Sequence, residues 1–505
     1  MSPYDHDASY KSFRPLDVNI RQADLHDSQG KSPSVASPSL EYSRKPWFES
    51  LLDTYSPTRK ESTSGYWLSF INVDAFMRTL FNPEEQLRMQ PALVYAGLAL
   101  ATLMKSSELE LGAAGRTRAV WLRDAAQTNL EQSLANQWID LPLAEAALML
   151  ALFESSAHPQ YHPSRAAASI NYLDSIIRRL QLTVVDNNDP DVSSFKPHHV
   201  PSVKSRSSSG SKDSPQKCSC IPLPPNANLP ADHYSSTWSY APPWDDNWTP
   251  HEAYKEECRR LCWSALTIVA GYSSQLAAFD KEPSQFFLTD PGNYALLFPG
   301  EVSDRSNHRS GQSPKDSVWA LYCRSMLLWS FSTRLSNDSI TDNIKAEYAY
   351  EVWGETQSIQ DALDAHVCNL DTALLYMCRE YLYNTRVTVT RTLRRFVPPS
   401  DVLRDSDSGI PHQPHQPVFS RKEAEEWLYY QDQVIKRVKS SINHLGEAQG
   451  HLLTRRPFQV TWFSSQLAIC LSLWNNDRSL ATALELAKSV LILVDIQNSL
   501  WPCPG

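Results

Sequence analysis

The chain has 505 residues, of which 42% are hydrophobic and 20% are charged, and its net charge is -9. This length predicts two to four domain-sized units, and the composition excludes a fully disordered polymer. A protein that neutralises phosphates is basic on at least one face, and the nearest approach to a basic block here is Arg391, Arg394 and Arg395, so we expect no direct binding of nucleic acid.

The first 184 residues divide into a polar tail and a helical part. Residues 1–40 are rich in Ser, Pro, Asp and Lys, which predicts disorder. Residues 41–184 form the first helical part, in which apolar residues recur at helical spacing over 47–55, 83–104, 116–137, 142–153 and 164–182. Apolar residues surround the axis of the segment 83–104, so we expect that helix to be buried on several sides.

The stretch 185–249 is rich in Ser and Pro and predicts a flexible linker. It ends in a loop whose tryptophans, Trp238, Trp244 and Trp248, are expected to dock on an apolar surface. A second helical part, 250–500, begins at Pro250, a favourable first-turn residue, with Thr249 as its N-cap.

Within this second part we predict helices at 316–335, 343–396 with breaks, 423–445, 456–474 and 478–494. Polar connections separate them at 301–316 and 397–420, and the alternating run VTVTRTL at 387–393 is interpreted as helix. The apolar stripe of 478–494 is Leu480, Leu484, Ala487, Leu491 and Val494. Residues 501–505 form a tail whose abrupt end suggests a lost C-terminal segment. The predicted fold is all-α, an irregular multi-helix assembly with long disordered loops.

The nine cysteines are odd in number, and several lie inside apolar helical patterns, which favours reduced intracellular thiols over a disulfide framework. The chain opens with the polar run MSPYDHDASYKSF, which is not a signal peptide. Its longest apolar run, 91–103, is shorter than the roughly 20 residues of a membrane helix. We therefore expect a soluble intracellular protein without membrane association.

Four passages carry a resemblance to a known family. The run Glu256 to Ser264 resembles the central helix of the middle homology region in fungal zinc-cluster transcription factors, where a Glu/Arg-Arg run precedes an aromatic residue, usually Trp. The runs 287–290 (FLTD) and 297–299 (LFP) are similar to that family's short Asp-then-Pro stretch. The segment 166–182 resembles the family helix that ends in a leucine-rich turn. Since Arg259 and Arg260 cannot both face the core of one helix, we interpret Trp263 as a core residue beside solvated arginines.

The family's DNA-binding module holds two zinc ions with six cysteines that include two Cys-x2-Cys pairs. Here Cys218 and Cys220 are separated by one residue, and Cys258 and Cys262 by three, so no zinc ligand or base-reading residue can be carried over. The resemblance implies a regulatory domain in the nucleus that works through protein partners of the transcription machinery and a small-molecule inducer. It implies no catalytic residue, metal or cofactor, and no specific binding of double-stranded DNA.

Two alternatives remain open. A helical scaffold that only binds proteins could use the amphipathic helix at 423–445 or the Trp-bearing loop. A magnesium-dependent, terpene-cyclase-like enzyme could use Asp245-Asp246-Asn247-Trp248 and Asn337-Asp338-Ser339-Ile340-Thr341 as metal motifs. The first motif lacks a third carboxylate, and Lys345 stands where the second needs one.

Other candidate chemistry is weaker. A helical-toroid glycosidase needs a carboxylate pair, and the sequence singles out none. His158 and His162 are spaced for a metal on a helix, but Pro159 and Pro163 favour a loop. His198 and His199 could collect zinc with Cys218 and Cys220, although disorder is the better interpretation. His412 and His415 lie in a proline-rich loop, and we assign them no chemistry.

Overall fold

The structure is a computed structural model, and the residues it describes belong to the unit that spans 38–505. The described residues are 70–203, 244–245, 247–279, 281–282, 284–306, 313–334, 341–366, 373–394, 421–442 and 452–503. The predicted tail at 1–40, helix at 47–55 and loop at 397–420 lie outside them.

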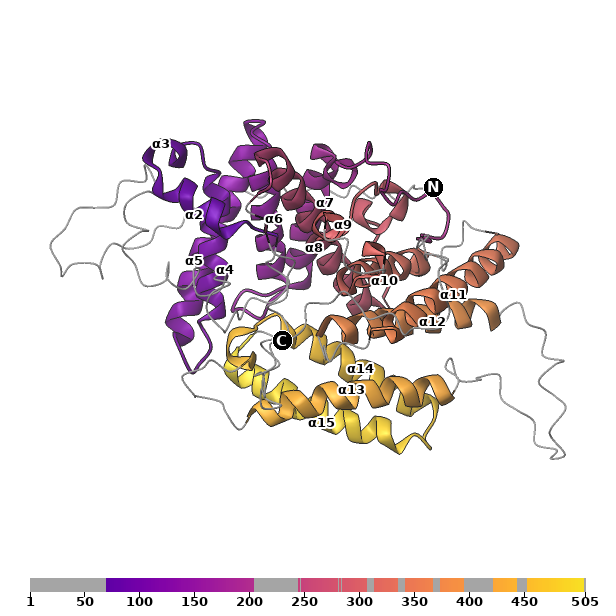
Figure 1. The fold of residues 1–505 in the computed structure, drawn as a ribbon. Coiled ribbons are helices and arrows are strands. Elements are labelled where there is room, and N and C mark those ends of the chain that lie inside the picture. Colours follow the sequence, from indigo (N-terminus) through magenta and orange to yellow (C-terminus); the bar gives the residue numbers. More distant parts are fainter. Residues whose placement is uncertain are drawn as a thin grey trace, which may run out of the picture. The chain divides into compact units, whose positions relative to one another are not determined.

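Among the described residues before the Ser/Pro-rich stretch there are six α-helices and a 3-10 turn (Figure 1). They are α2 Val73–Phe81, α3 Pro83–Gln86, α4 Pro91–Met104, α5 Gly112–Ala135, α6 Leu141–Glu154, α7 Pro163–Leu180 and η4 Leu182–Val184.

The described residues that follow this stretch form eight α-helices and four 3-10 turns. They are α8 Pro250–Ala278, η6 Phe287–Thr289, η7 Pro291–Asn293, α9 Glu301–Ser306, η8 Pro314–Asp316, α10 Val318–Thr333, α11 Asp342–Asp364, α12 Ala373–Arg394, α13 Arg421–Ser441, η12 Leu452–Arg455, α14 Gln459–Asn476 and α15 Ala481–Leu500. The described residues contain no strand, only one isolated bridge between Ser194 and Ala295. The all-α prediction is confirmed, including the helical interpretation of 387–393.

Side chains at the first turns explain why several helices begin where they do. Thr249 accepts a hydrogen bond at Oγ1 from the Glu252 amide at 3.2 Å, which confirms the predicted N-cap of α8. Asp140 caps α6 in the same way, and Ser317 caps α10. Each cap satisfies an amide that the helix itself leaves without a partner.

The core consists of two clusters of buried apolar residues that meet along α4. Leu93 and Leu100 of α4 belong to one cluster, with α6, α8, α10 and α12, whereas Leu98 and Leu103 belong to the other, with α13, α14 and α15. α4 is therefore buried on several sides, as predicted, although the predicted helix 83–104 is broken between α3 and α4. In Figure 1 the helices α13, α14 and α15 lie together.

Three predictions about packed segments need correction. The flexible linker does not begin at 185, because Asp186, Phe195, Val200 and Val203 are buried. Residues 501–505 are not simply a tail: Trp501 is fully buried and donates from Nε1 to the Leu453 carbonyl at 3.0 Å.

The predicted stripe of the last helix is also wrong in part. Leu491 is 47% exposed, and the face of α15 that is buried carries Ala483, Leu486, Val490 and Leu493. The helix has apolar residues on more than one face, so the sequence pattern did not determine which face α13 and α14 would cover.

No helix among the described residues has the length and apolar character needed to cross a membrane.

Candidate functional site

The first half of α8 carries a cluster of buried charges. Arg259 and Arg260 are each only 2% exposed, which corrects the prediction that they are solvated. Both point inward because α8 is covered on several sides, by α6, α7, α10 and α14 among others. Burying a guanidinium without a carboxylate partner is costly, so the partners of these two residues decide whether the arrangement is stable.

Arg259 is held by acidic residues from two segments. Its Nε and Nη2 donate to Oδ2 and Oδ1 of Asp186, both at 2.8 Å, in a bidentate pair. Its Nη1 donates to Glu252 at 2.6 Å and to Glu256 at 3.2 Å. Burial alone would lower the pKa of Arg259, but the hydrogen bonds and charges of these carboxylates raise it above the usual value, so the side chain stays charged.

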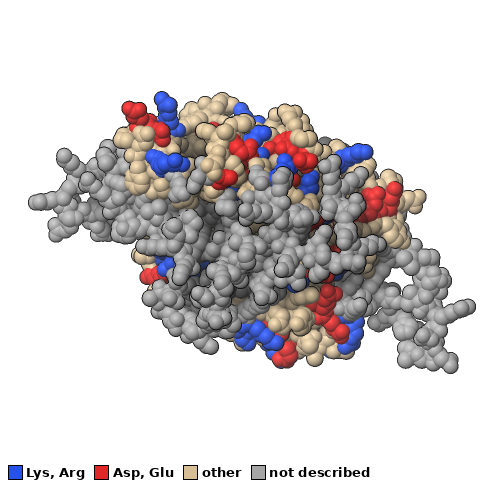
Figure 2. All heavy atoms as spheres, in the orientation of Figure 1, with Lys and Arg blue, Asp and Glu red and all other residues tan. Residues whose placement is uncertain are grey.

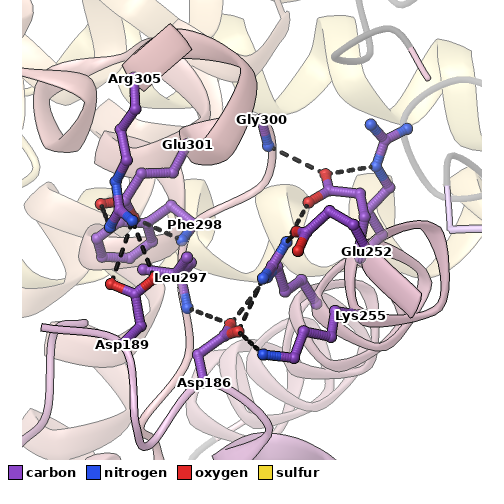
Figure 3. Close-up of polar contacts among 12 residues, drawn as sticks. Asp186, Asp189, Glu252, Lys255, Leu297, Phe298, Gly300, Glu301 and Arg305 are labelled. Carbon is purple, nitrogen blue, oxygen red and sulfur yellow. Dashed lines mark hydrogen bonds and ion pairs between the residues drawn. The ribbon is translucent and has the colours of Figure 1, made fainter. Parts of the chain in front are cut away.

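The same carboxylates fix a loop that lies far away in sequence (Figure 3). Asp186 accepts from the Leu297 amide at 3.0 Å, and Glu256 accepts from the Gly300 amide at 3.1 Å and from Arg260 Nε at 2.9 Å. Arg305 also forms ion pairs with Asp189 and with Glu301. We call this set, with Lys255 at its edge, the α8 ionic cluster: Asp186, Asp189, Glu252, Lys255, Glu256, Arg259, Arg260, Glu301 and Arg305.

Aromatic residues close the α8 ionic cluster on two sides. Trp263 is 3% exposed, as predicted for a core residue, and lies between Tyr294 and Phe298, with ring centroids 5.3 Å from each. Its Nε1 donates to the Leu297 carbonyl at 2.9 Å. Trp244 does dock, but on a cation: its ring centroid lies 4.0 Å from the guanidinium carbon of Arg260. Trp238 lies outside the described residues.

The four passages that carry the family resemblance contact one another here. Trp263 of the run 256–264 contacts Leu297 and Phe298 of the run 297–299. The carboxylate of Asp174, in the segment 166–182, accepts from the amides of Phe287 and Leu288 at 3.0 and 2.9 Å. The passages thus form one packed unit.

A partly enclosed cavity of about 130 Å³ lies beside the second half of α8. It is bounded by α8, α12 and α14, with the end of α6, and we call it the α12 cavity. Its apolar wall consists of Leu152, Ile268, Met377, Phe458, Trp462 and Ile469. Gly271 also lines it, and a Cβ added at that position meets no atom within 4 Å.

The carboxylate of Glu380 is the principal polar group in the α12 cavity. It accepts from Trp462 Nε1 at 3.2 Å and from Gln466 Nε2 at 2.8 Å. Burial raises the pKa of this carboxyl, while hydrogen bonds from Trp462, Gln466 and Gln431 act in the opposite direction. No lysine, arginine or histidine among the described residues forms an ion pair with Glu380, in contrast to every carboxylate of the α8 ionic cluster.

A pair of carboxyls that the sequence did not single out lies between α6 and α8. Glu145 is buried and hydrogen-bonded to Glu257, and burial followed by the Glu257 charge raises its pKa well above the usual value. Burial raises the pKa of Glu257 as well. Glycosidases keep their two carboxyls about 5 Å apart or more to admit the sugar and water. A direct hydrogen bond leaves no such space, so this pair gives the glycosidase alternative no support.

The candidate metal motifs are not brought together among the described residues. Asp245 accepts from the amide of Asn247 at 2.9 Å in a local turn before α8. Lys345 is 6% exposed on α11. Asp246 and the run 337–340 are outside the description, and Thr341 directly precedes α11. The described residues contain no group of three or more His, Cys, Asp or Glu side chains placed to hold a metal ion.

The candidate histidines and cysteines have local roles where they are described. His158 and His162 lie in the connection between α6 and α7, as predicted: His158 is buried beside Phe153, and His162 caps α7 by accepting from Ser164. His198 and His199 lie in a turn at 196–199. Burial raises the pKa of Cys258 to about 12 and raises that of Cys262 well above its usual value, which keeps both thiols protonated. Cys218, Cys220, His412 and His415 lie outside the described residues.

Neither of the surfaces considered for binding has the expected character among the described residues. The apolar stripe of α13, including Leu428, Ile435 and Val438, is buried against the helices α12 and α15 and is not free for a partner. On the coloured part of the face in Figure 2, basic and acidic side chains are interspersed and form no continuous basic band. Arg391 and Arg394 lie on α12, and Arg395 is outside the described residues.

Comparisons of the chain with protein-family models, curated proteins and solved structures find no match. The resemblance to zinc-cluster transcription factors therefore rests on the four passages themselves.

Proposed function

We propose that this chain is the regulatory body of a fungal zinc-cluster-type transcription factor. It acts in the nucleus through protein partners of the transcription machinery and leaves DNA binding to another module. The observation that carries the proposal is the convergence of the four family-like passages on one buried unit, although they are spread from 166 to 299 in the sequence.

The chemistry of this unit supports a regulatory rather than a catalytic role. Its carboxylates are occupied by arginines and backbone amides. Groups that are fully paired in this way hold segments together but have no free acid, base or nucleophile to offer a substrate. A body of this kind works by presenting surfaces and by changing shape.

The proposal is tested by fusing the chain to a heterologous DNA-binding domain and measuring a reporter with matching sites. We expect the fusion to raise or lower expression at least threefold relative to the DNA-binding domain alone, at equal protein levels. Arg259→Leu, which removes the centre of the α8 ionic cluster, should abolish the effect. Arg421→Leu, at an exposed ion pair on α13, is the matched control and should preserve it.

Two outcomes would contradict the proposal. An unchanged reporter would favour a scaffold that only binds proteins. A reporter effect that survives Arg259→Leu would show that regulation does not depend on the α8 ionic cluster.

A further inference from the structure

The α12 cavity has the size of a small ligand. Its volume of about 130 Å³ is comparable with the roughly 150 Å³ of a protein cavity that accommodates benzene. Its apolar wall would take up one aromatic ring or an aliphatic body of similar size. Because Gly271 contributes no side chain, the space beside α8 stays open.

Three polar side chains of the α12 cavity already use their donors within the fold and keep acceptors free: Gln466, Thr461 and Ser465. Gln466 gives its Nε2 to Glu380, and its Oε1 is buried without a hydrogen-bond partner. Thr461 and Ser465 donate their hydroxyls to carbonyls of their own helix turn, at 3.2 and 3.0 Å, so they present only lone pairs. The Ser274 hydroxyl also lacks a partner. A molecule that enters with its own donors can therefore satisfy these free acceptors.

The charge balance indicates which donors fit. Glu380 is surrounded by neutral donors, and none of the described cationic residues is paired with it. A carboxylate can accept about four hydrogen bonds, so Glu380 retains capacity for a further donor. A positively charged donor gains more here than a neutral one, since a charge-assisted hydrogen bond is about twice as strong. Aromatic side chains on the wall, such as Trp462 and Tyr272, add favourable surfaces for a cation.

We propose that the α12 cavity binds a small organic cation, a primary ammonium on an apolar body of about one ring, with the ammonium donating to Glu380 and to Gln466 Oε1. Under the proposed function this molecule is the inducer, since it would link α8, α12 and α14. That regulatory role rests on the proposed function, whereas binding is measured on the purified chain, so the two can fail separately.

The experiment compares benzylamine, benzyl alcohol and benzoate by calorimetric titration of the purified full-length chain. These probes share one ring and differ in charge. We expect benzylamine to bind at least tenfold more tightly than benzyl alcohol, which corresponds to about 1.4 kcal/mol, and benzoate to bind least. Failure of benzylamine to bind at millimolar concentration, or equal affinity for all three probes, would overturn the inference.

Four variants locate the site. Glu380→Gln should remove the preference for the amine while leaving benzyl alcohol binding intact, whereas the surface control Glu351→Gln should change neither. Gly271→Leu should fill the cavity and abolish binding of both probes, whereas Gly354→Leu, on the exposed side of α11, should preserve it. Melting curves of each variant verify that the fold is retained. A preference for benzylamine that persists in Glu380→Gln would show that the cation binds elsewhere.

Discussion

Carboxylates that lie beside the two halves of α8 are in opposite situations. In the α8 ionic cluster, Asp186 and Glu256 are paired with arginines and backbone amides, and aromatic rings fill the remaining space. In the α12 cavity, Glu380 has only neutral donors and lies beside open volume. The same chemical group thus ties segments together where a cation is supplied by the chain. Where no described cation is at hand, the carboxylate can accept a further donor, which under our proposal is a cation from solution.

The largest expected effect comes from removing an arginine of the α8 ionic cluster. Arg259→Leu leaves Asp186 and Glu256 buried with fewer donors, and loss of one partner of a buried pair costs about 3–5 kcal/mol. We expect that decrease in the free energy of unfolding, measured by urea denaturation followed by circular dichroism. The decrease includes release of the 297–300 loop, because its amides bind the same carboxylates.

The control is an arginine at the surface. The Arg421 side chain is 57% exposed and pairs with Glu425 at 2.9 Å, and such exposed pairs contribute about 0–1 kcal/mol. Arg421→Leu should therefore change the free energy of unfolding by less than about 1 kcal/mol. Equal losses in the two variants would mean that the α8 ionic cluster does not hold the fold together.

The sequence predicts where α8 begins but not which distant residues its arginines contact. Its first turn depends on Thr249 and Pro250, which are adjacent in the chain, and that prediction is confirmed. The burial of Arg259 depends on Asp186, which is 73 residues away in a stretch predicted to be a flexible linker. Without a partner nearby in the sequence, Arg259 and Arg260 are predicted to be solvated. Long-range pairing of charges is not encoded in local periodicity, so no local pattern reveals it.

The α12 cavity was beyond sequence prediction for a related reason. Glu380 and Gln466 are 86 residues apart, and neither stands out in its own helix. The open space at Gly271 exists only because three helices fail to fill it. In the sequence, this glycine is only a residue of low helix propensity within a long predicted helix. The family resemblance implies a small-molecule inducer but assigns no residues to its binding site.

Replacing Glu380, which pairs with no described cationic residue, should give a pH-dependent gain in stability. Glu380→Gln removes a carboxyl whose pKa is raised by burial in the folded state. In the range between the unfolded carboxyl pKa, about 4.3, and the raised folded pKa, the folded state binds more protons than the unfolded state. Stability of the unsubstituted chain therefore falls as pH rises through this range, and the penalty persists above it.

We accordingly expect Glu380→Gln to raise the free energy of unfolding at neutral pH by an amount on the order of 1 kcal/mol, as the desolvated charge is removed. The gain should vanish below the unfolded carboxyl pKa, where the unsubstituted side chain is neutral in both states. Urea denaturation of both proteins across this pH range measures the difference. Loss of stability in the variant at neutral pH would indicate that the hydrogen bonds from Trp462 and Gln466 to the carboxylate outweigh the cost of its desolvation.

The smallest expected effect distinguishes open space from packed space along the helices. Alanine is favoured over glycine inside a helix by about 0.8–1 kcal/mol, provided that its methyl group meets no obstacle. At Gly271, as at the exposed Gly354, a Cβ meets nothing within 4 Å, whereas at Gly115 it would lie 2.3 Å from Ser106 Oγ. Gly271→Ala and Gly354→Ala should therefore raise the melting temperature by similar amounts, and Gly115→Ala should lower it. If Gly271→Ala instead lowered the melting temperature as Gly115→Ala does, the space beside α8 would be filled in solution, and the α12 cavity would have no room for a ligand.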